Sequence, residues 1–139
     1  MIPSVRRTYL FPLAVVILLC GCHSSGRSGS CALIERADLV VVHHHSQEYA
    51  TATDRVITNP EQIRRLIAFA NNRRRVSQPS TYTMADPLVT ATFYEEGDFV
   101  GAIGLGSNFF FRSCMKWRGI RSATDSEIRD FKQLLEQAN

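Results

Sequence analysis

The spacing of hydrophobic and polar residues changes several times along the chain, and each spacing predicts a different element. Runs rich in β-branched and aromatic residues are typical of β-strands. Such runs cover residues 37–42, 49–58, 88–94, 99–105 and 109–112, and residues 116–121 can add a last strand. Glu96-Gly97-Asp98 and Gly106-Ser107-Asn108 fall between the later runs. These short polar segments predict tight turns and therefore an antiparallel meander.

Two other segments have the 3.6-residue spacing of amphipathic helices. The first begins at Asn59, a favoured N-cap residue, with Pro60 at the first helical position and Gln62 three residues after the cap. Its apolar face contains Ile63, Leu66, Ile67 and Ala70. The second begins at Thr124, and Glu127 three residues later fits a capping box. Its apolar face contains Ile128, Phe131, Leu134, Leu135 and Ala138.

The elements therefore follow one another in the order ββαβββα. This order predicts an α+β fold, in which an antiparallel sheet has two helices packed on one face. A polar connection over residues 73–86 separates the first helix from the meander. We expect all these elements to form a single domain over residues 31–139.

The first 21 residues have a different character from the rest. Arg6 and Arg7, with no acidic residue nearby, precede an apolar run over residues 10–20. That run is too short for a membrane-spanning helix, which needs about 20 residues. A positive start followed by a short apolar run is typical of a secretory signal.

The run ends in Leu19-Cys20-Gly21-Cys22. This tetrapeptide resembles the lipobox of bacterial lipoproteins, with Leu at −3, a small residue at −1 and cysteine at +1. The resemblance implies cleavage after Gly21, diacylglycerol on the sulfur of Cys22, and acylation, such as with palmitate, of the new N-terminus. Two or more acyl chains make anchoring to a membrane stable. The alternative is an ordinary secretory signal with an incidental cysteine.

The lipobox divides the chain into a signal peptide (1–21), a lipidated cysteine with a flexible Gly/Ser linker (22–30) and the folded domain. His23 follows the lipidated cysteine where an Asp would favour retention in the inner membrane. By analogy with lipoprotein sorting, this favours the outer membrane of the cell envelope, facing the periplasm. In general plan, the domain is similar to small envelope lipoproteins of unknown function.

The net charge of +3 decreases once the signal peptide is removed. That segment holds two of the 16 basic side chains and none of the 13 acidic ones, which leaves 14 basic and 13 acidic side chains in the mature chain. A net charge of +1 gives no reason to expect nucleic acid as a partner.

Export also decides how the four cysteines are used. Cleavage removes Cys20 and lipid occupies Cys22, so Cys31 and Cys114 remain. Compartments outside the inner membrane permit disulfides. We expect one Cys31–Cys114 bond between the N-terminal edge of the domain and the last hairpin; the alternative is two free thiols.

A group of cations around an aromatic residue is the candidate binding surface. It consists of Arg112, Lys116, Trp117, Arg118 and Arg121. Such a group can stack on a sugar ring or form the centre of a protein interface. The alternative places Trp117 in the core with cations beside it.

Three further clusters have plain structural explanations. His43-His44-His45 could hold a metal, but it lacks Cys or His partners at ligand spacing, so we expect no metal. Arg73-Arg74-Arg75, with Arg64 and Arg65, forms a basic patch that could meet anionic lipid or an acidic partner; a solvated helix end is the favoured explanation. The glycines over 101–106 indicate close packing, because their spacing does not fit a nucleotide-binding loop.

No catalytic motif is present in the sequence. We therefore expect no enzyme activity and no cofactor. The expected function is that of a membrane-anchored binding or accessory module, with an envelope protein or polymer as partner. The alternatives are a periplasmic enzyme inhibitor and a protein that binds a small ligand or metal.

The lipobox leads to a direct test. We expect Cys22→Ala to abolish both acylation and cleavage, because Cys22 supplies the sulfur that receives the lipid. Membrane fractionation and mass spectrometry of the N-terminal peptide would detect this loss. The matched variant Cys20→Ala should be processed normally, and normal processing of Cys22→Ala would contradict the lipobox.

Overall fold

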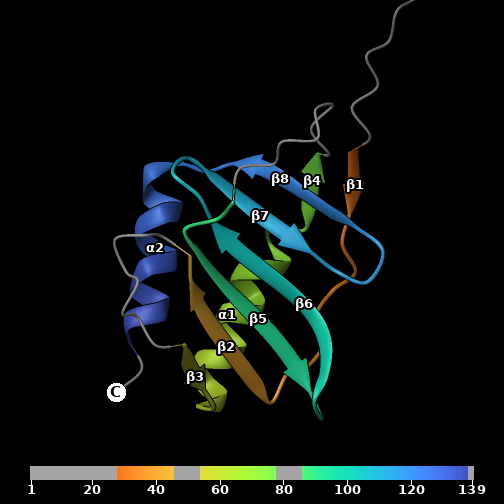
Figure 1. The fold of residues 1–139 in the computed structure, drawn as a ribbon, viewed down its shortest axis with the longest axis vertical. Coiled ribbons are helices and arrows are strands. Elements are labelled where there is room, and N and C mark those ends of the chain that lie inside the picture. The colour runs from red at the N-terminus through yellow and green to blue at the C-terminus, as the bar shows by residue number, and fades with distance from the viewer. Residues whose placement is uncertain (1–27, 46–53, 78–85, 138–139) are drawn as a thin grey trace, which may run out of the picture.

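The computed structural model describes residues 28–45, 54–77 and 86–137, which form one antiparallel sheet with two helices on one face (Figure 1). The predicted α+β fold is therefore confirmed. The strands are β1 (Ser28–Ser30), β2 (Leu39–His44), β3 (Arg55–Ile57), β4 (Arg75–Ser77), β5 (Val89–Glu95), β6 (Asp98–Leu105), β7 (Phe109–Ser113) and β8 (Arg118–Ser122). The helices are α1 (Pro60–Asn71) and α2 (Asp125–Glu136). The eight strands lie in the order β1-β4-β8-β7-β6-β5-β2-β3.

The meander follows the sequence pattern closely. β5 and β6 are joined by a two-residue turn in which Glu96 and Gly97 both have positive φ, 53° and 89°. Positive φ at both central residues matches the right-handed twist of a hairpin, and glycine adopts it at little cost. The Asp38 carboxylate accepts a hydrogen bond from the Glu96 backbone N–H at 3.1 Å. This bond holds the turn against the start of β2.

Two short strands contradict the sequence interpretation. β1 lies within the predicted flexible linker over 22–30, and β4 lies within the predicted polar connection over 73–86. They pair with each other at one edge of the sheet, Gly29 opposite Val76. Neither three-residue segment has a periodicity that predicts a strand, so their conformation depends on this pairing. Of the predicted strand over 49–58, residues 49–53 lie outside the described residues, and the described part contains β3.

The N-cap of α1 is confirmed, but the side chain of Gln62, three residues after the cap, does not take part in capping. The Asn59 side chain accepts hydrogen bonds from the backbone N–H groups of Glu61 and Gln62, at 3.0 and 3.1 Å. The Gln62 side chain does not return to the cap. It is buried, and its Nε2 donates to the Leu134 carbonyl of α2 at 2.8 Å, which links the two helices.

Three phenylalanines from different elements meet at the centre of the core. Phe69 of α1, Phe110 of β7 and Phe131 of α2 have ring centroids 5.2 to 5.7 Å apart. Two of the contacts are edge-to-face, a geometry that aromatic rings favour. Because α1 and α2 both reach Phe110, they cover the same face of the sheet, as predicted.

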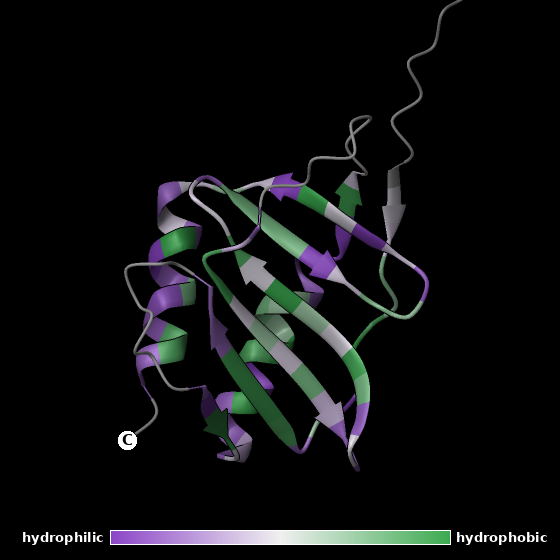
Figure 2. Ribbon diagram, viewed as in Figure 1, coloured by the Kyte–Doolittle hydropathy of each residue, from purple (hydrophilic) through white to green (hydrophobic). Residues whose placement is uncertain are grey.

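Hydrophobic residues extend this core along the strands, and Figure 2 colours the ribbon green at the hydrophobic positions of the sheet and helices. The other members from the strands and their connections are Ile34, Val40, Val42, Ile57, Val89, Ala91, Phe93, Ile103 and Leu105. Gly101 allows Ile34 to approach, since a Cβ there would lie 3.2 Å from the Ile34 Cδ1. This agrees with the expectation that the glycines over 101–106 mark close packing.

Arg112 is an exception in this core, because its side chain is fully buried. Its Nη1 donates to the Ala102 carbonyl at 2.8 Å, but Nε and Nη2 have no hydrogen-bond partner. No described carboxylate pairs with it. Burial without a counter-ion lowers the pKa of the Arg112 guanidinium to about 10. At neutral pH the group is charged in both folded and unfolded states, so the folded state carries the full cost of desolvating it.

We therefore expect Arg112→Met to increase the free energy of unfolding by about 1–3 kcal/mol, since an unbranched apolar chain replaces an unpaired buried charge. Urea unfolding at pH 7, followed by circular dichroism, would measure the change. Arg112→Ala is the control. It also removes the charge but leaves a cavity, so it should be less stable than Arg112→Met. Lower stability of Arg112→Met than of the natural chain would contradict the desolvation argument.

Candidate functional site

The Cys31–Cys114 disulfide forms, as predicted. The two Cα atoms are 5.7 Å apart, and the bond joins residues 83 positions apart in sequence. Cys31 donates its backbone N–H to the Arg74 carbonyl at 3.0 Å, and Cys114 donates to the Trp117 carbonyl at 2.8 Å. On the chain-entropy model a loop of this length stabilises the fold by at most about 4.5 kcal/mol. The disulfide thus fixes the segment after β1 against the β7–β8 hairpin.

Trp117 of that hairpin covers β1. A Cβ placed on Gly29 would lie 2.3 Å from the indole ring, so a larger side chain at position 29 would displace the ring. Trp117 is half-buried by this contact. The indole therefore packs on the first strand of the domain, at the edge of the sheet and outside the hydrophobic core.

The predicted binding surface is wrong as a single patch. Arg112 lies in the core, while Lys116 is exposed at the tip of the hairpin. Arg118 and Arg121 are three residues apart on β8, so their side chains lie on opposite faces of the sheet. Arg118 lies beside the Phe111 ring at 5.9 Å, on the face away from the helices. Arg121 points toward α2, where it joins a polar network.

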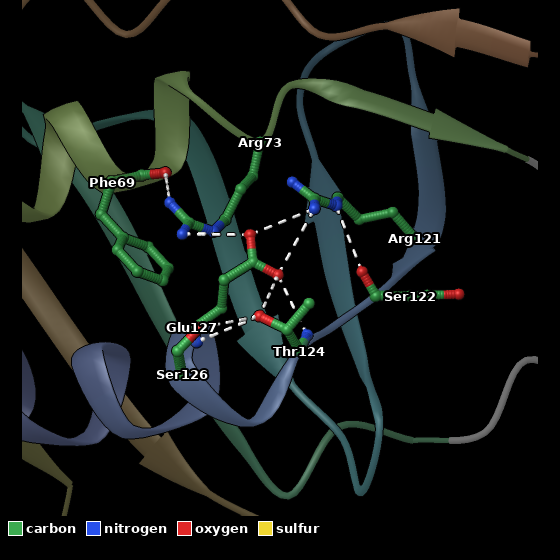
Figure 3. A network of polar contacts seen from close by, with 7 residues as sticks. All are labelled: Phe69, Arg73, Arg121, Ser122, Thr124, Ser126 and Glu127. Atoms are coloured by element: carbon green, nitrogen blue, oxygen red, sulfur yellow. Dashed lines mark hydrogen bonds and ion pairs between the residues drawn. The ribbon is translucent and has the colours of Figure 1, made fainter.

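Glu127 is the centre of that network (Figure 3). Its carboxylate accepts hydrogen bonds from Arg73 and Arg121, each at 3.1 Å. It also accepts the Thr124 backbone N–H at 3.0 Å, while the Thr124 hydroxyl accepts the Glu127 N–H at 3.3 Å. The predicted capping box of α2 is thereby confirmed. The same carboxylate joins the end of α1, the start of α2 and strand β8.

The pKa values of Glu127 and Arg73 are both displaced in this network, for different physical reasons. The hydrogen bond from the Thr124 backbone, assisted by Arg121 and Arg73, lowers the pKa of Glu127, and partial burial opposes the shift only in part. Burial also lowers the pKa of Arg73, despite its pairing with Glu127. The Arg73 guanidinium lies 3.4 Å from the centroid of the Phe69 ring and donates to the Phe69 carbonyl at 3.0 Å. Arg73 is thus held as part of the interior.

The basic patch predicted from sequence divides into two parts. Arg64 and Arg65 pair with Glu61 on the exposed face of α1, Arg65 at 3.1 Å. Arg74 and Arg75 are also exposed, but no described residue forms an ion pair or hydrogen bond with either side chain. The unpaired charge is therefore concentrated beyond the end of α1, beside β1.

We call this region the arginine hollow. It comprises two adjoining pockets of about 380 and 490 Å³ that share Arg75 and Arg121. The lining residues are Gly29, Ser30, Asn71, Asn72, Arg73, Arg74, Arg75, Val76, Ser77 and Arg121. Four of these are arginines and none is acidic. Glu127 neutralises one of the four charges from the adjacent α2, which leaves a local excess of about three.

A second concavity, which we call the α2 cleft, lies between α2 and the ends of strands β2, β3, β5 and β6. It has a volume of about 570 Å³. The apolar lining consists of Val42, Leu88, Val89, Leu105, Ile128 and Leu135. The polar lining consists of His44, Arg55, Ser107, Lys132 and Glu136. The Arg55 guanidinium donates to the Leu135 carbonyl, so it holds the end of α2 against β3. The cleft volume lies within the range of small-ligand sites.

The histidine run makes separate contacts. His43 pairs with Asp54 at 2.8 Å, and the His45 ring lies 3.1 Å from the Thr90 hydroxyl. His44 lines the α2 cleft. Within the described part of the chain, no three His, Cys, Asp or Glu side chains gather closely enough to hold a metal ion.

Comparison with known proteins does not assign this site. No family model, curated protein or solved structure matches the chain. In the described residues, no helix is long and apolar enough to cross a membrane.

The Glu127 network should make the stability of the domain depend on pH. A carboxylate whose pKa is lowered by folding stabilises the fold above its unfolded pKa and loses that contribution as pH falls through its folded pKa. We expect Glu127→Gln to reduce the free energy of unfolding at pH 7 by about 1–2 kcal/mol. The difference from the natural chain should shrink below about pH 4.

Urea unfolding at pH 7 and pH 3 would measure this change. Glu136→Gln removes the same charge from the exposed end of α2, and it should have little effect at either pH. An equal effect of Glu127→Gln at both pH values would mean that ionisation of Glu127 contributes nothing.

Proposed function

We propose that the chain is a membrane-anchored, non-catalytic binding protein of the cell envelope that receives an apolar group of an envelope protein or polymer in the α2 cleft. The observation that carries the binding role is the cleft itself. It has a volume of about 570 Å³ and a mainly aliphatic wall. A concave apolar site with a few polar groups at its edge is typical of ligand binding.

The anchor part of the proposal rests on the lipobox and the domain boundary. Ser28, the first residue of β1, follows Cys22 by six residues. An extended chain covers at most about 3.6 Å for each residue, so the domain would begin within about 22 Å of the lipidated cysteine. Such a short tether would keep the α2 cleft close to partners in the same membrane or in the adjoining polymer layer.

The positions of the residues with displaced pKa values support a non-catalytic role. Displaced values occur at Arg73, Arg112 and Glu127, and none of these residues lines the α2 cleft. Each shift has a structural explanation in burial, helix capping or ion pairing. The cleft lining therefore supports binding better than acid–base chemistry.

The volume of the cleft also favours the alternative of a small-ligand-binding protein, because pockets of this size enclose small organic molecules. Native mass spectrometry of the purified protein would separate the two ideas. A bound molecule that disappears on denaturation would favour the small ligand, and an empty protein would favour the macromolecular partner.

Site-specific photocrosslinking in cells would test the main proposal. A photoreactive residue in place of Ser107, at the rim of the α2 cleft, should give one defined product, which mass spectrometry would identify. The matched control is position 133, an exposed residue of α2 outside the cleft lining. The product at position 107 should decrease when Cys22→Ala prevents anchoring. The same products at both positions, or none at either, would contradict binding at the cleft.

A further inference from the structure

We propose that the arginine hollow docks the domain onto anionic phospholipid headgroups of the membrane that holds its anchor. The proposal rests on the proposed lipid at Cys22 and adds a second contact to it. The hollow and the α2 cleft share no lining residue, so one site can be occupied while the other remains free.

Two arginines of the hollow carry charge that no described residue pairs. Arg73 and Arg121 share Glu127, whereas Arg74 and Arg75 have no described partner. The fold leaves Arg74 and Arg75 hydrated and free to approach an external anion. Arginine binds phosphate through a planar fork of N–H donors, and Ser30, Ser77 and Asn72 supply further donors around the hollow.

The same two arginines lie close to the point where the tether enters the domain. Ser30 lies directly opposite Arg75 in the β1–β4 pair, and the Cys31 N–H donates to the Arg74 carbonyl. Both free arginines are therefore adjacent to the strand by which the tether enters the domain. Ser30 follows Cys22 by eight residues, so Arg75 would lie within about 30 Å of chain length from the lipid.

The unpaired charge and its closeness to the tether together favour a membrane surface over a soluble acidic partner. A basic cluster held near a bilayer by a covalent tether meets headgroups at a high effective concentration. Each arginine close to an anionic leaflet contributes about 1 kcal/mol, which corresponds to roughly a five-fold change in the binding constant. For Arg74 and Arg75 together, we expect about a 25-fold preference for the docked orientation on an anionic membrane.

Trp117 supplies a built-in probe of docking. It is the only tryptophan in the chain, and it covers Gly29, which lines the hollow. The full-length protein would be reconstituted into vesicles of phosphatidylcholine, with or without phosphatidylglycerol. Both vesicles would contain a nitroxide on the lipid headgroup, which quenches a tryptophan that approaches the bilayer surface.

We expect stronger quenching of Trp117 on vesicles with phosphatidylglycerol. The extra quenching should be lost in the double variant Arg74→Gln/Arg75→Gln and in about 1 M salt, where the screening length is about 3 Å. Arg74→Lys/Arg75→Lys should retain most of it, because the charge remains. The matched control Arg64→Gln/Arg65→Gln removes the same charge from α1 and should behave as the natural chain.

Equal quenching on both kinds of vesicle, or unchanged quenching in Arg74→Gln/Arg75→Gln, would overturn the proposal. A soluble acidic polymer would then be the better match for the hollow. The anchor is judged separately from the mass of the Cys22 peptide. The quenching comparison holds whether a lipid or an uncleaved leader keeps the chain on the vesicle, so failure of the anchor and failure of docking give different results.

Discussion

The carboxylate of Glu127 is the point on which the arrangement of the two helices depends. It completes the cap of α2 through Thr124, receives Arg73 from the end of α1, and receives Arg121 from β8. α1 is far in sequence from β8 and α2, so one ionised group fixes the end of α1 against both of them. The aromatic contacts of Phe69 and Phe131 with Phe110 can form only when both helices occupy this face of the sheet.

The same constraint explains where the two concavities lie. Glu127 draws the start of α2 toward the end of α1 and β8, while Arg55 holds the other end of α2 through the Leu135 carbonyl. Along the helix between these contacts, Ile128 and Lys132 border the α2 cleft. Glu127 also satisfies only part of the arginine cluster. The charge that remains on Arg74 and Arg75 makes the hollow beside β1 basic.

Much of the fold could be predicted because its main signals are local. Hydrophobic spacing identified the meander, α1 and α2, and the Thr124–Glu127 capping box depends on residues three positions apart. β1 and β4 could not be predicted, because each is stabilised by pairing with a segment more than 40 residues away. Gln62 shows the same limit. Its local pattern fits a cap, but a tertiary hydrogen bond to Leu134 determines its position.

The candidate sites were harder to predict than the fold, because they are formed by tertiary contacts that residue spacing in the sequence does not indicate. Three arginines that are close in sequence lie in different places. Arg112 is buried in the core, Arg118 lies on the sheet face away from the helices, and Arg121 points toward α2. Cys31 and Cys114 could be paired because the proposed export and lipidation would leave only these two cysteines, and this count needs no geometry. A pocket cannot be predicted by counting residues of one type in this way.

The N-terminal edge of the domain is where the proposed lipid anchor would connect to the rest of the molecule. A tether alone would let the domain rotate freely, and β1 by itself is too short to resist that motion. The structure strengthens this edge in three ways, through the β1–β4 pair, the Trp117 contact on Gly29 and the disulfide at Cys31. A covalent bond placed directly after the first strand would transmit any force on the lipid into the β7–β8 hairpin. A domain built in this way would keep the arginine hollow, and not the α2 cleft, nearest to the tether.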